Sequence, residues 1–155
     1  MTVKKNQLIR VLLAEDDAED RELFEEALAA ADVNALLITV DDGEKLMKYL
    51  AKADKGFPDI IFLDIGMPCK NGKECVKEIR RNDKLKHVPI VMFSNSSYEE
   101  DIEETFLNGA NLYVAKPVFF HDEVKILKQI FAFDWQKELL KPDKKRFILY
   151  APPVG

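Results

Sequence analysis

The chain has 155 residues, a formal net charge of −5, 47% hydrophobic residues and 33% charged residues. This length suits one well-packed globular domain, and its interspersed charges argue against a nucleic-acid-binding surface, which requires a basic face. No apolar run is long enough to cross a bilayer, and the N-terminus lacks the apolar core of a signal peptide, so we expect no membrane segment. The two cysteines, Cys69 and Cys75, form no disulfide framework, so we expect a cytoplasmic protein.

Short apolar runs rich in branched residues recur along the chain. Each run is too short for a helix, and its continuous apolar character predicts a β-strand buried on both faces. The predicted strands are Ile9–Ala14, Leu36–Val40, Ile60–Leu63, Val88–Phe93 and Leu112–Ala115.

Segments with apolar residues at helical spacing lie between and after these strands. The apolar positions are Leu23, Phe24, Ala27 and Leu28; Leu46, Met47 and Leu50; Cys75, Val76 and Ile79; Ile102, Phe106 and Leu107; and Val124, Leu127 and Phe131. Asp41-Asp42 is expected to cap the second helix, and Ser96 or Ser97 the fourth, which Asn108-Gly109 closes. The alternation predicts an α/β fold, a doubly wound five-stranded parallel sheet with five helices.

In such folds, ligands bind beyond the carboxyl ends of the strands. Glu15 and Asp16 follow the first predicted strand, Asp64 the third, Ser94 the fourth and Lys116 the fifth. Crowded carboxylates repel one another, and a hard cation such as Mg²⁺ relieves that repulsion. With the cation bound, one carboxylate becomes a nucleophile towards phosphorus, while the ammonium and the hydroxyl neutralise phosphoryl oxygens.

Four segments resemble the signature blocks of response-regulator receiver domains, in the order and at the spacing of that family. These segments are Val11–Asp17, Leu63–Pro68, Val91–Ser94 and Tyr113–Pro117, and the resemblance covers roughly Ile9 to Phe133. The resemblance implies the flavodoxin-like receiver fold with strand order 2-1-3-4-5, as in single-domain chemotaxis receivers.

The resemblance also implies the roles of individual residues. Asp64 matches the phospho-acceptor. Asp16 matches the direct Mg²⁺ ligand, Glu15 matches a neighbour that acts through water, and the carbonyl of Gly66 matches the third protein ligand. Lys116 matches the phosphate-binding lysine, whose bond to the following proline is often cis in the family.

The resemblance also assigns the residues that change conformation on phosphorylation. Ser94 matches the switch hydroxyl, Tyr113 the aromatic residue that turns inward with it, and Gly72 the glycine that begins the third helix. Asn95 stands where the family usually has a small residue, so we hypothesise that Gly66 and Asn95 tune the lifetime of the acyl phosphate.

The resemblance implies a single-domain response regulator that takes a phosphoryl group from a sensor histidine kinase or a histidine phosphotransfer protein. It would catalyse its own phosphorylation and dephosphorylation, and present the surface of the fourth helix, fifth strand and fifth helix to a downstream protein. The expected organisation is an N-terminal tail at 1–8, the receiver domain at 9–133 and a C-terminal extension at 134–155.

The C-terminal extension at 134–155 contains several apolar and aromatic residues. Trp135, Leu139 and Leu140 could continue the fifth helix, and the apolar run Phe147–Tyr150 is expected to pack on its own domain or on a second chain, which leaves a homodimer open. A similar aromatic tail is found in receivers that work with bacterial phytochrome-type histidine kinases.

Other interpretations remain for comparison. A haloacid-dehalogenase-type phosphatase needs an acidic residue where Gly66 stands, and a flavodoxin-like cofactor binder needs a phosphate loop where Glu15-Asp16-Asp17 would repel phosphate. The principal alternative is a pseudo-receiver that acts only as a protein-binding scaffold. Among single residues, Asp17 is expected to cap a helix rather than to bind metal, and Cys69 to be an inert loop thiol.

Overall fold

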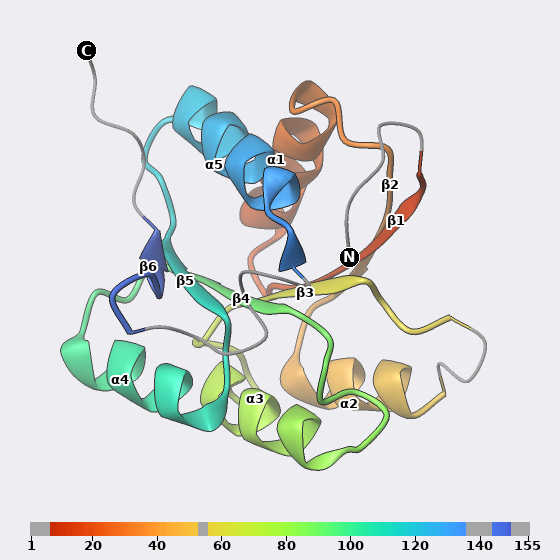
Figure 1. Cartoon of the computed structure of the whole chain (residues 1–155), viewed down its shortest axis with the longest axis vertical. Helices are drawn as coiled ribbons and strands as arrows, with labels where there is room; N and C mark the ends of the chain where they lie inside the picture. The colour runs from red at the N-terminus through yellow and green to blue at the C-terminus, as the bar shows by residue number, and fades with distance from the viewer. Residues whose placement is uncertain (1–6, 53–55, 136–143, 150–155) are drawn as a thin grey trace.

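The computed structural model describes residues 7–52, 56–135 and 144–149, and this part of the chain forms one three-layer α/β unit (Figure 1). The strands are β1 (Ile9–Ala14), β2 (Ala35–Val40), β3 (Ile60–Leu63), β4 (Ile90–Ser94), β5 (Leu112–Ala115) and β6 (Ile148–Leu149). The helices are α1 (Ala18–Ala30), α2 (Gly43–Ala51), α3 (Gly72–Arg81), α4 (Glu99–Asn108) and α5 (Phe120–Ala132). None of these helices is long and apolar enough to cross a membrane.

All strands pair in parallel, in the order β2-β1-β3-β4-β5-β6. Helices α1 and α5 cover one face of the sheet, and α2, α3 and α4 cover the other (Figure 1). The predicted fold class and strand order are therefore confirmed, with the short sixth strand added beyond β5.

The core has one half on each face of the sheet. Beneath α1 and α5, the rings of Phe24, Phe62 and Phe93 pack edge to face, with centroids 4.9 Å apart for Phe24 and Phe62 and 5.7 Å apart for Phe24 and Phe93. On the other face, the inward residues of α2, α3 and α4 pack on the sheet. The inner strands are thus buried on both faces, as continuous apolar runs predict.

Two strand predictions need correction. The β2 strand is only partly buried because it is an edge strand, and Leu36 is 44% exposed. The β4 strand begins at Ile90 rather than Val88, since the Val88 N–H closes a turn on the Leu85 carbonyl and Pro89 has no N–H to pair.

The helix caps agree with the sequence in part. Asp17 caps α1 by accepting a hydrogen bond from the Asp20 N–H, and Asp42 caps α2 by accepting one from Lys45 N–H. Gly109 ends α4 in the left-handed conformation, with φ of 108°. The predicted serine cap of α4 is wrong, because the cap position is Tyr98. Ser96 lies two residues before it, and its hydroxyl donates to the Asp101 carboxylate at 2.5 Å.

The described part of the tail packs on its own domain. Phe147 is 2% exposed and lies against Phe106, and its carbonyl accepts a hydrogen bond of 2.7 Å from the Tyr113 N–H. Helix α5 ends at Ala132, so the prediction that Trp135 continues this helix is wrong; Leu139 and Leu140 lie outside the described residues. Trp135 is nevertheless buried, in the core half beneath α1 and α5.

We expect Phe147→Ala to detach the tail without unfolding the sheet. The substitution removes a buried ring, but we expect the free energy of unfolding to fall by no more than roughly 2 kcal/mol, because β6 can detach while β1–β5 stay paired. Amide hydrogen exchange should then accelerate selectively at Tyr113, whose N–H the tail protects. Unchanged exchange at Tyr113, or global unfolding, would contradict this view of the tail; Ile148→Ala, at a half-buried position, is the milder comparison.

Candidate functional site

The strand register brings the predicted site residues to one edge of the sheet. Ala14 lies level with Leu63 in β1 and β3, and Ser94 lies level with Ala115 in β4 and β5. Glu15, Asp64 and Lys116 are the next residues along their strands, so they emerge side by side. The order of the strands, rather than closeness in the sequence, assembles the site.

Three carboxylates form the centre of this edge. One oxygen from each of Glu15, Asp16 and Asp64 lies within 4.8 Å of the others; Glu15 and Asp64 are buried and Asp16 is exposed. Burial, with the charge of Asp64 adding to it, raises the pKa of Glu15 to about 7, although the Lys116 ammonium opposes this shift. A set of hard oxygen donors with one open side fits a divalent cation such as Mg²⁺.

The Lys116 ammonium bridges carboxylates from three different elements. It lies 2.8 Å from Asp20 Oδ2 on α1 and 3.0 Å from Asp64 Oδ2, and it also pairs with Glu15 Oε1. Burial alone would lower the pKa of Lys116, but the hydrogen bonds to Asp20 and Glu15 and the charge of Asp64 raise it above its usual value. The ammonium therefore stays charged at neutral pH.

The loop after β3 holds the Asp64 carboxylate in place. Its Oδ1 atom accepts a hydrogen bond of 2.7 Å from the Ile65 N–H, which leaves Oδ2 for Lys116. Gly72 packs so closely under this loop that a Cβ atom there would overlap the Asp64 carbonyl oxygen, and it begins α3 as the resemblance implied. A Cβ atom at Gly66 would meet nothing, so the approach beside this residue is open.

Of the two predicted switch residues, Ser94 lines the same cavity, and Tyr113 is hydrogen-bonded to Ser96 in the lining of that cavity. Ser94 is 3% exposed, and its hydroxyl accepts a hydrogen bond of 3.3 Å from the Ser96 N–H. Tyr113 is buried, and its hydroxyl donates to the Ser96 carbonyl at 2.7 Å. The cavity has a volume of about 410 Å³ and is lined by Glu15, Asp16, Asp17, Asp20, Asp64, Ile65, Gly66, Ser94, Asn95, Ser96, Tyr98, Asp101 and Lys116.

One expectation about this site is wrong. The described residues contain no cis peptide bond, so the bond between Lys116 and Pro117 is trans. Here the Lys116 side chain is aimed by its ion pairs and by the backbone hydrogen bond of 2.9 Å from its N–H to the Ser94 carbonyl.

The sequence interpretation missed three residues around Lys116. Asp20 pairs with the ammonium, Arg21 donates to the Glu15 carbonyl at 2.8 Å, and Glu123 of α5 places a buried carboxyl nearby. Asp20 and Glu123 share one signal in the sequence, since each lies in the first turn of a helix that follows a strand and so near the sheet edge where that strand ends. The signal is weak, because an acidic residue in a first turn is ordinary.

Glu123 should make stability depend on pH. Its Oε2 atom has no hydrogen-bond partner within the part of the chain that the structure describes. Burial, with the charge of Asp20 adding to it, raises the pKa of Glu123 from 4.5 to about 7. Between these values the folded protein keeps a proton that the unfolded chain releases, so the free energy of unfolding falls as pH rises.

We therefore expect Glu123→Gln, which cannot ionise, to be more stable than the wild type at pH 8 by roughly 1 to 2 kcal/mol, and to lose the advantage near pH 5. Urea unfolding measured from pH 5 to pH 8 checks this, with Glu19→Gln, an exposed position, as the control. Parallel pH profiles for the wild type and Glu123→Gln would contradict it.

Comparison with known proteins identifies the family. Residues 11–130 match the model of the response regulator receiver domain. The chain belongs to this family. The receiver domain is 30% identical over 136 residues to response regulator Rcp1 of Synechocystis sp., an alignment that covers 85% of this chain and 92% of that protein.

Solved structures agree with this assignment. The receiver domain superposes on the phosphorylated cyanobacterial phytochrome response regulator RcpA with a TM-score of 0.77 and 33% identity, covering 88% of this chain and all of that one. It matches the Mn²⁺-bound form of Rcp1 with a TM-score of 0.74 and 29% identity, covering 87% of this chain and 99% of the other. It is therefore the receiver domain of a response regulator in two-component signalling, with an acidic pocket suited to a divalent cation.

Proposed function

We propose that this receiver domain accepts a phosphoryl group on Asp64, with Mg²⁺ as cofactor, from a sensor histidine kinase or a histidine phosphotransfer protein. The observation that carries the proposal is the placement of Asp64, which shares a donor set within 4.8 Å with Glu15 and Asp16 and lies 3.0 Å from the Lys116 ammonium. No other cluster of three metal-ligating side chains occurs in the described residues.

The proposed reaction is an in-line displacement at phosphorus. An Asp64 carboxylate oxygen forms the new P–O bond as the bond from phosphorus to the donor nitrogen breaks, and the donor histidine leaves. Asp16, Asp64, the Gly66 carbonyl and, through water, Glu15 would hold the cation, which supplies positive charge against the phosphoryl oxygens. Lys116 would neutralise a second phosphoryl oxygen, and the Ser94 hydroxyl would donate to a third.

The conformational change on phosphorylation would be transmitted from Ser94 to helix α4. Ser94 connects to Ser96, and the Ser96 hydroxyl pairs with Asp101 in the first turn of α4. Lys73 of α3 in turn binds Asp101 at 2.6 Å. A movement of the Ser94 side chain towards the phosphate would change its contact with Ser96 and, through Ser96, the contacts of Asp101. The Tyr113 side chain would then move as well.

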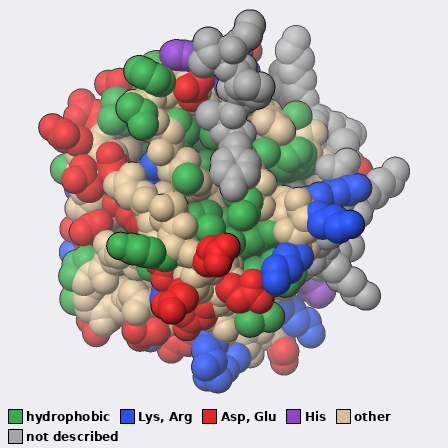
Figure 2. All heavy atoms as spheres, turned by 90° about the vertical axis from the view of Figure 1, so that its left-hand side faces the viewer, with side chains coloured by type: hydrophobic (Ala, Val, Ile, Leu, Met, Phe, Trp, Pro, Cys, Tyr) green, Lys and Arg blue, Asp and Glu red, His purple; other side chains and the backbone are tan. Residues whose placement is uncertain are grey.

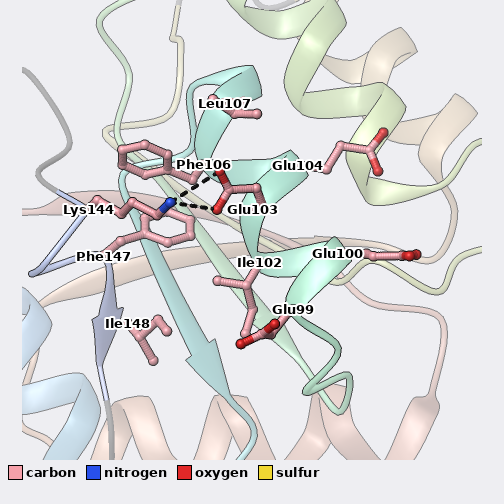
Figure 3. A pocket seen from close by; sticks show the side chains of 10 residues that line it. All are labelled: Glu99, Glu100, Ile102, Glu103, Glu104, Phe106, Leu107, Lys144, Phe147 and Ile148. Atoms are coloured by element: carbon pink, nitrogen blue, oxygen red, sulfur yellow. Dashed lines mark hydrogen bonds and ion pairs between the residues drawn. The ribbon is translucent and has the colours of Figure 1, made fainter.

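The output surface would be the face of α4, β5 and α5. A groove of about 820 Å³ lies there between α4 and β6, with Ile102, Phe106 and Phe147 on its floor (Figure 3). Figure 2 looks onto this side and shows hydrophobic side chains gathered beside acidic ones. The glutamates around the groove are Glu99, Glu100, Glu103 and Glu104, and Lys144 binds Glu103 at 3.0 Å. A downstream protein that reads the switch would contact this surface.

The domain organisation of 1–8, 9–133 and 134–155 remains part of this proposal. The kinship with phytochrome response regulators supports a sensor histidine kinase as the donor. A homodimer stays a separate proposal, because Phe147 of the tail already packs on its own domain. The alternative function is a pseudo-receiver that binds proteins without phosphorylation. It is less well supported, because oxygens of the acceptor and the acidic pair lie within 4.8 Å of one another and the lysine pairs with both Asp64 and Glu15.

The decisive experiment is intact-mass spectrometry of the purified chain after incubation with acetyl phosphate. We expect the mass of one phosphoryl group to be added with Mg²⁺ and not after chelation. Gain without metal would refute the role of the cation, and no gain under either condition would favour the pseudo-receiver. Size-exclusion chromatography of the same samples tests the homodimer.

A further inference from the structure

The Lys116 ammonium has no spare donor. An ammonium carries three N–H bonds, and here Glu15, Asp20 and Asp64 each lie within hydrogen-bonding reach of the Lys116 nitrogen. A phosphoryl group on Asp64 would bring new oxygens that need the same ammonium. The Asp64 oxygen that carries the group loses its negative charge in the acyl phosphate, so the phosphoryl oxygens take over its contact and compete for the ammonium with Glu15 and Asp20.

The three partners differ in how freely they can leave. The side chain of Glu15 is 2% exposed, so its carboxylate cannot readily turn to water, and Asp64 itself carries the phosphoryl group. The Asp20 side chain is 30% exposed and lies in the first turn of α1, so it can turn to solvent at little cost.

Apart from its pair with Lys116, the Asp20 carboxylate has the general role of an acidic residue near a helix N-terminus, which Glu19 shares. The cap of α1 is Asp17, and Asp20 contributes only its backbone N–H to that cap. Its carboxylate instead adds negative charge to a region that already contains three carboxylates and the buried Glu123, whose pKa the Asp20 charge helps to raise. Such crowding is costly unless the ion pair with Lys116 offsets it.

We propose that Asp20 is a positioning residue that holds Lys116 in the unphosphorylated site and competes with the phosphoryl group for its ammonium. The inference rests on the proposed phosphorylation of Asp64. Asp20 thus sets how strongly the site favours the unphosphorylated state, without contacting the reacting atoms.

The test compares two substitutions that remove the same charge from the same helix turn. The steady-state ratio of phosphorylated to unphosphorylated chain is measured by intact mass at fixed acetyl phosphate and Mg²⁺. For Asp20→Asn we expect this ratio to rise about twofold to fivefold, the range of a partly exposed ion pair. Glu19→Gln changes the same charge at an exposed neighbour that has no contact with Lys116, and its ratio should stay near that of the wild type.

Conservative rescue separates pairing from a structural effect. Asp20→Glu restores a carboxylate, and the partly exposed site has room for the longer side chain, so its ratio should return towards the wild-type value. Equal ratios for Asp20→Asn and Glu19→Gln, a lower ratio for Asp20→Asn than for the wild type, or a ratio for Asp20→Glu as high as for Asp20→Asn would each overturn the proposal. Absence of phosphorylation in the wild type would instead refute the proposed function on which it rests.

Discussion

Replacing Asp64 with Asn is expected to abolish phosphoryl incorporation. The amide keeps the shape of the side chain and can still accept the Ile65 N–H hydrogen bond, but it has no anionic oxygen to attack phosphorus. It also removes one carboxylate from the donor set for the cation. Intact mass after incubation with acetyl phosphate and Mg²⁺ should show no phosphorylated species.

The control for this variant is Asp41→Asn. Asp41 also follows a parallel strand, β2, but it pairs with Lys45 at 2.7 Å and does not line the site cavity. This variant should incorporate phosphate as the wild type does. Full incorporation by Asp64→Asn would show that another residue is the acceptor and would refute the assignment.

Replacing Arg80 with Met is expected to cause the largest loss of stability, about 3 to 5 kcal/mol. The Arg80 guanidinium donates at 2.8 Å to the carbonyls of Gly109 and Val88 and to the side-chain oxygen of Asn111, so it ties α3 to the end of α4 and to the start of β4. Burial lowers its pKa to about 10, which still leaves the group charged at neutral pH. Methionine fills similar space but removes the Arg80 donor from the carbonyls of Gly109 and Val88, whereas Asn111 Oδ1 keeps its hydrogen bond from the Ile90 N–H.

Arg81→Met supplies the matched comparison. Arg81 is exposed and is the last residue of α3, so its replacement should change the free energy of unfolding by no more than about 0.5 kcal/mol. Urea denaturation of both variants measures the difference. Similar losses for the two would mean that the hydrogen bonds of Arg80 contribute little.

The sequence predicts the central sheet well because buried parallel strands have a plain signature. Ile9–Ala14, Ile60–Leu63 and Leu112–Ala115 were predicted with the observed bounds. The convergence of Glu15, Asp64 and Lys116 also follows from local information, since each stands directly after a strand and parallel strands share one edge.

The errors arise where the outcome depends on contacts that the local sequence pattern does not show. Asp20 and Lys116 are 96 positions apart, so no spacing pattern reveals their ion pair. Ser96 is of a residue type that often caps helices, but the cap position of α4 is Tyr98, and the Ser96 hydroxyl donates to Asp101. Leu107 has helical spacing with Ile102 and Phe106 yet is 70% exposed, because the tail covers only part of that face.

The pairing of β6 with β5 has a consequence for shortened versions of this protein. Phe147 covers Tyr113, with ring centroids 6.2 Å apart, and Tyr113 gives its N–H to the tail. Ending the chain at Phe133 would bare an unpaired strand edge beside the apolar surface of Phe106. That combination favours strand exchange between molecules and aggregation. By pairing with β5, the tail therefore covers the edge of this strand and hinders its pairing with a strand of a neighbouring molecule.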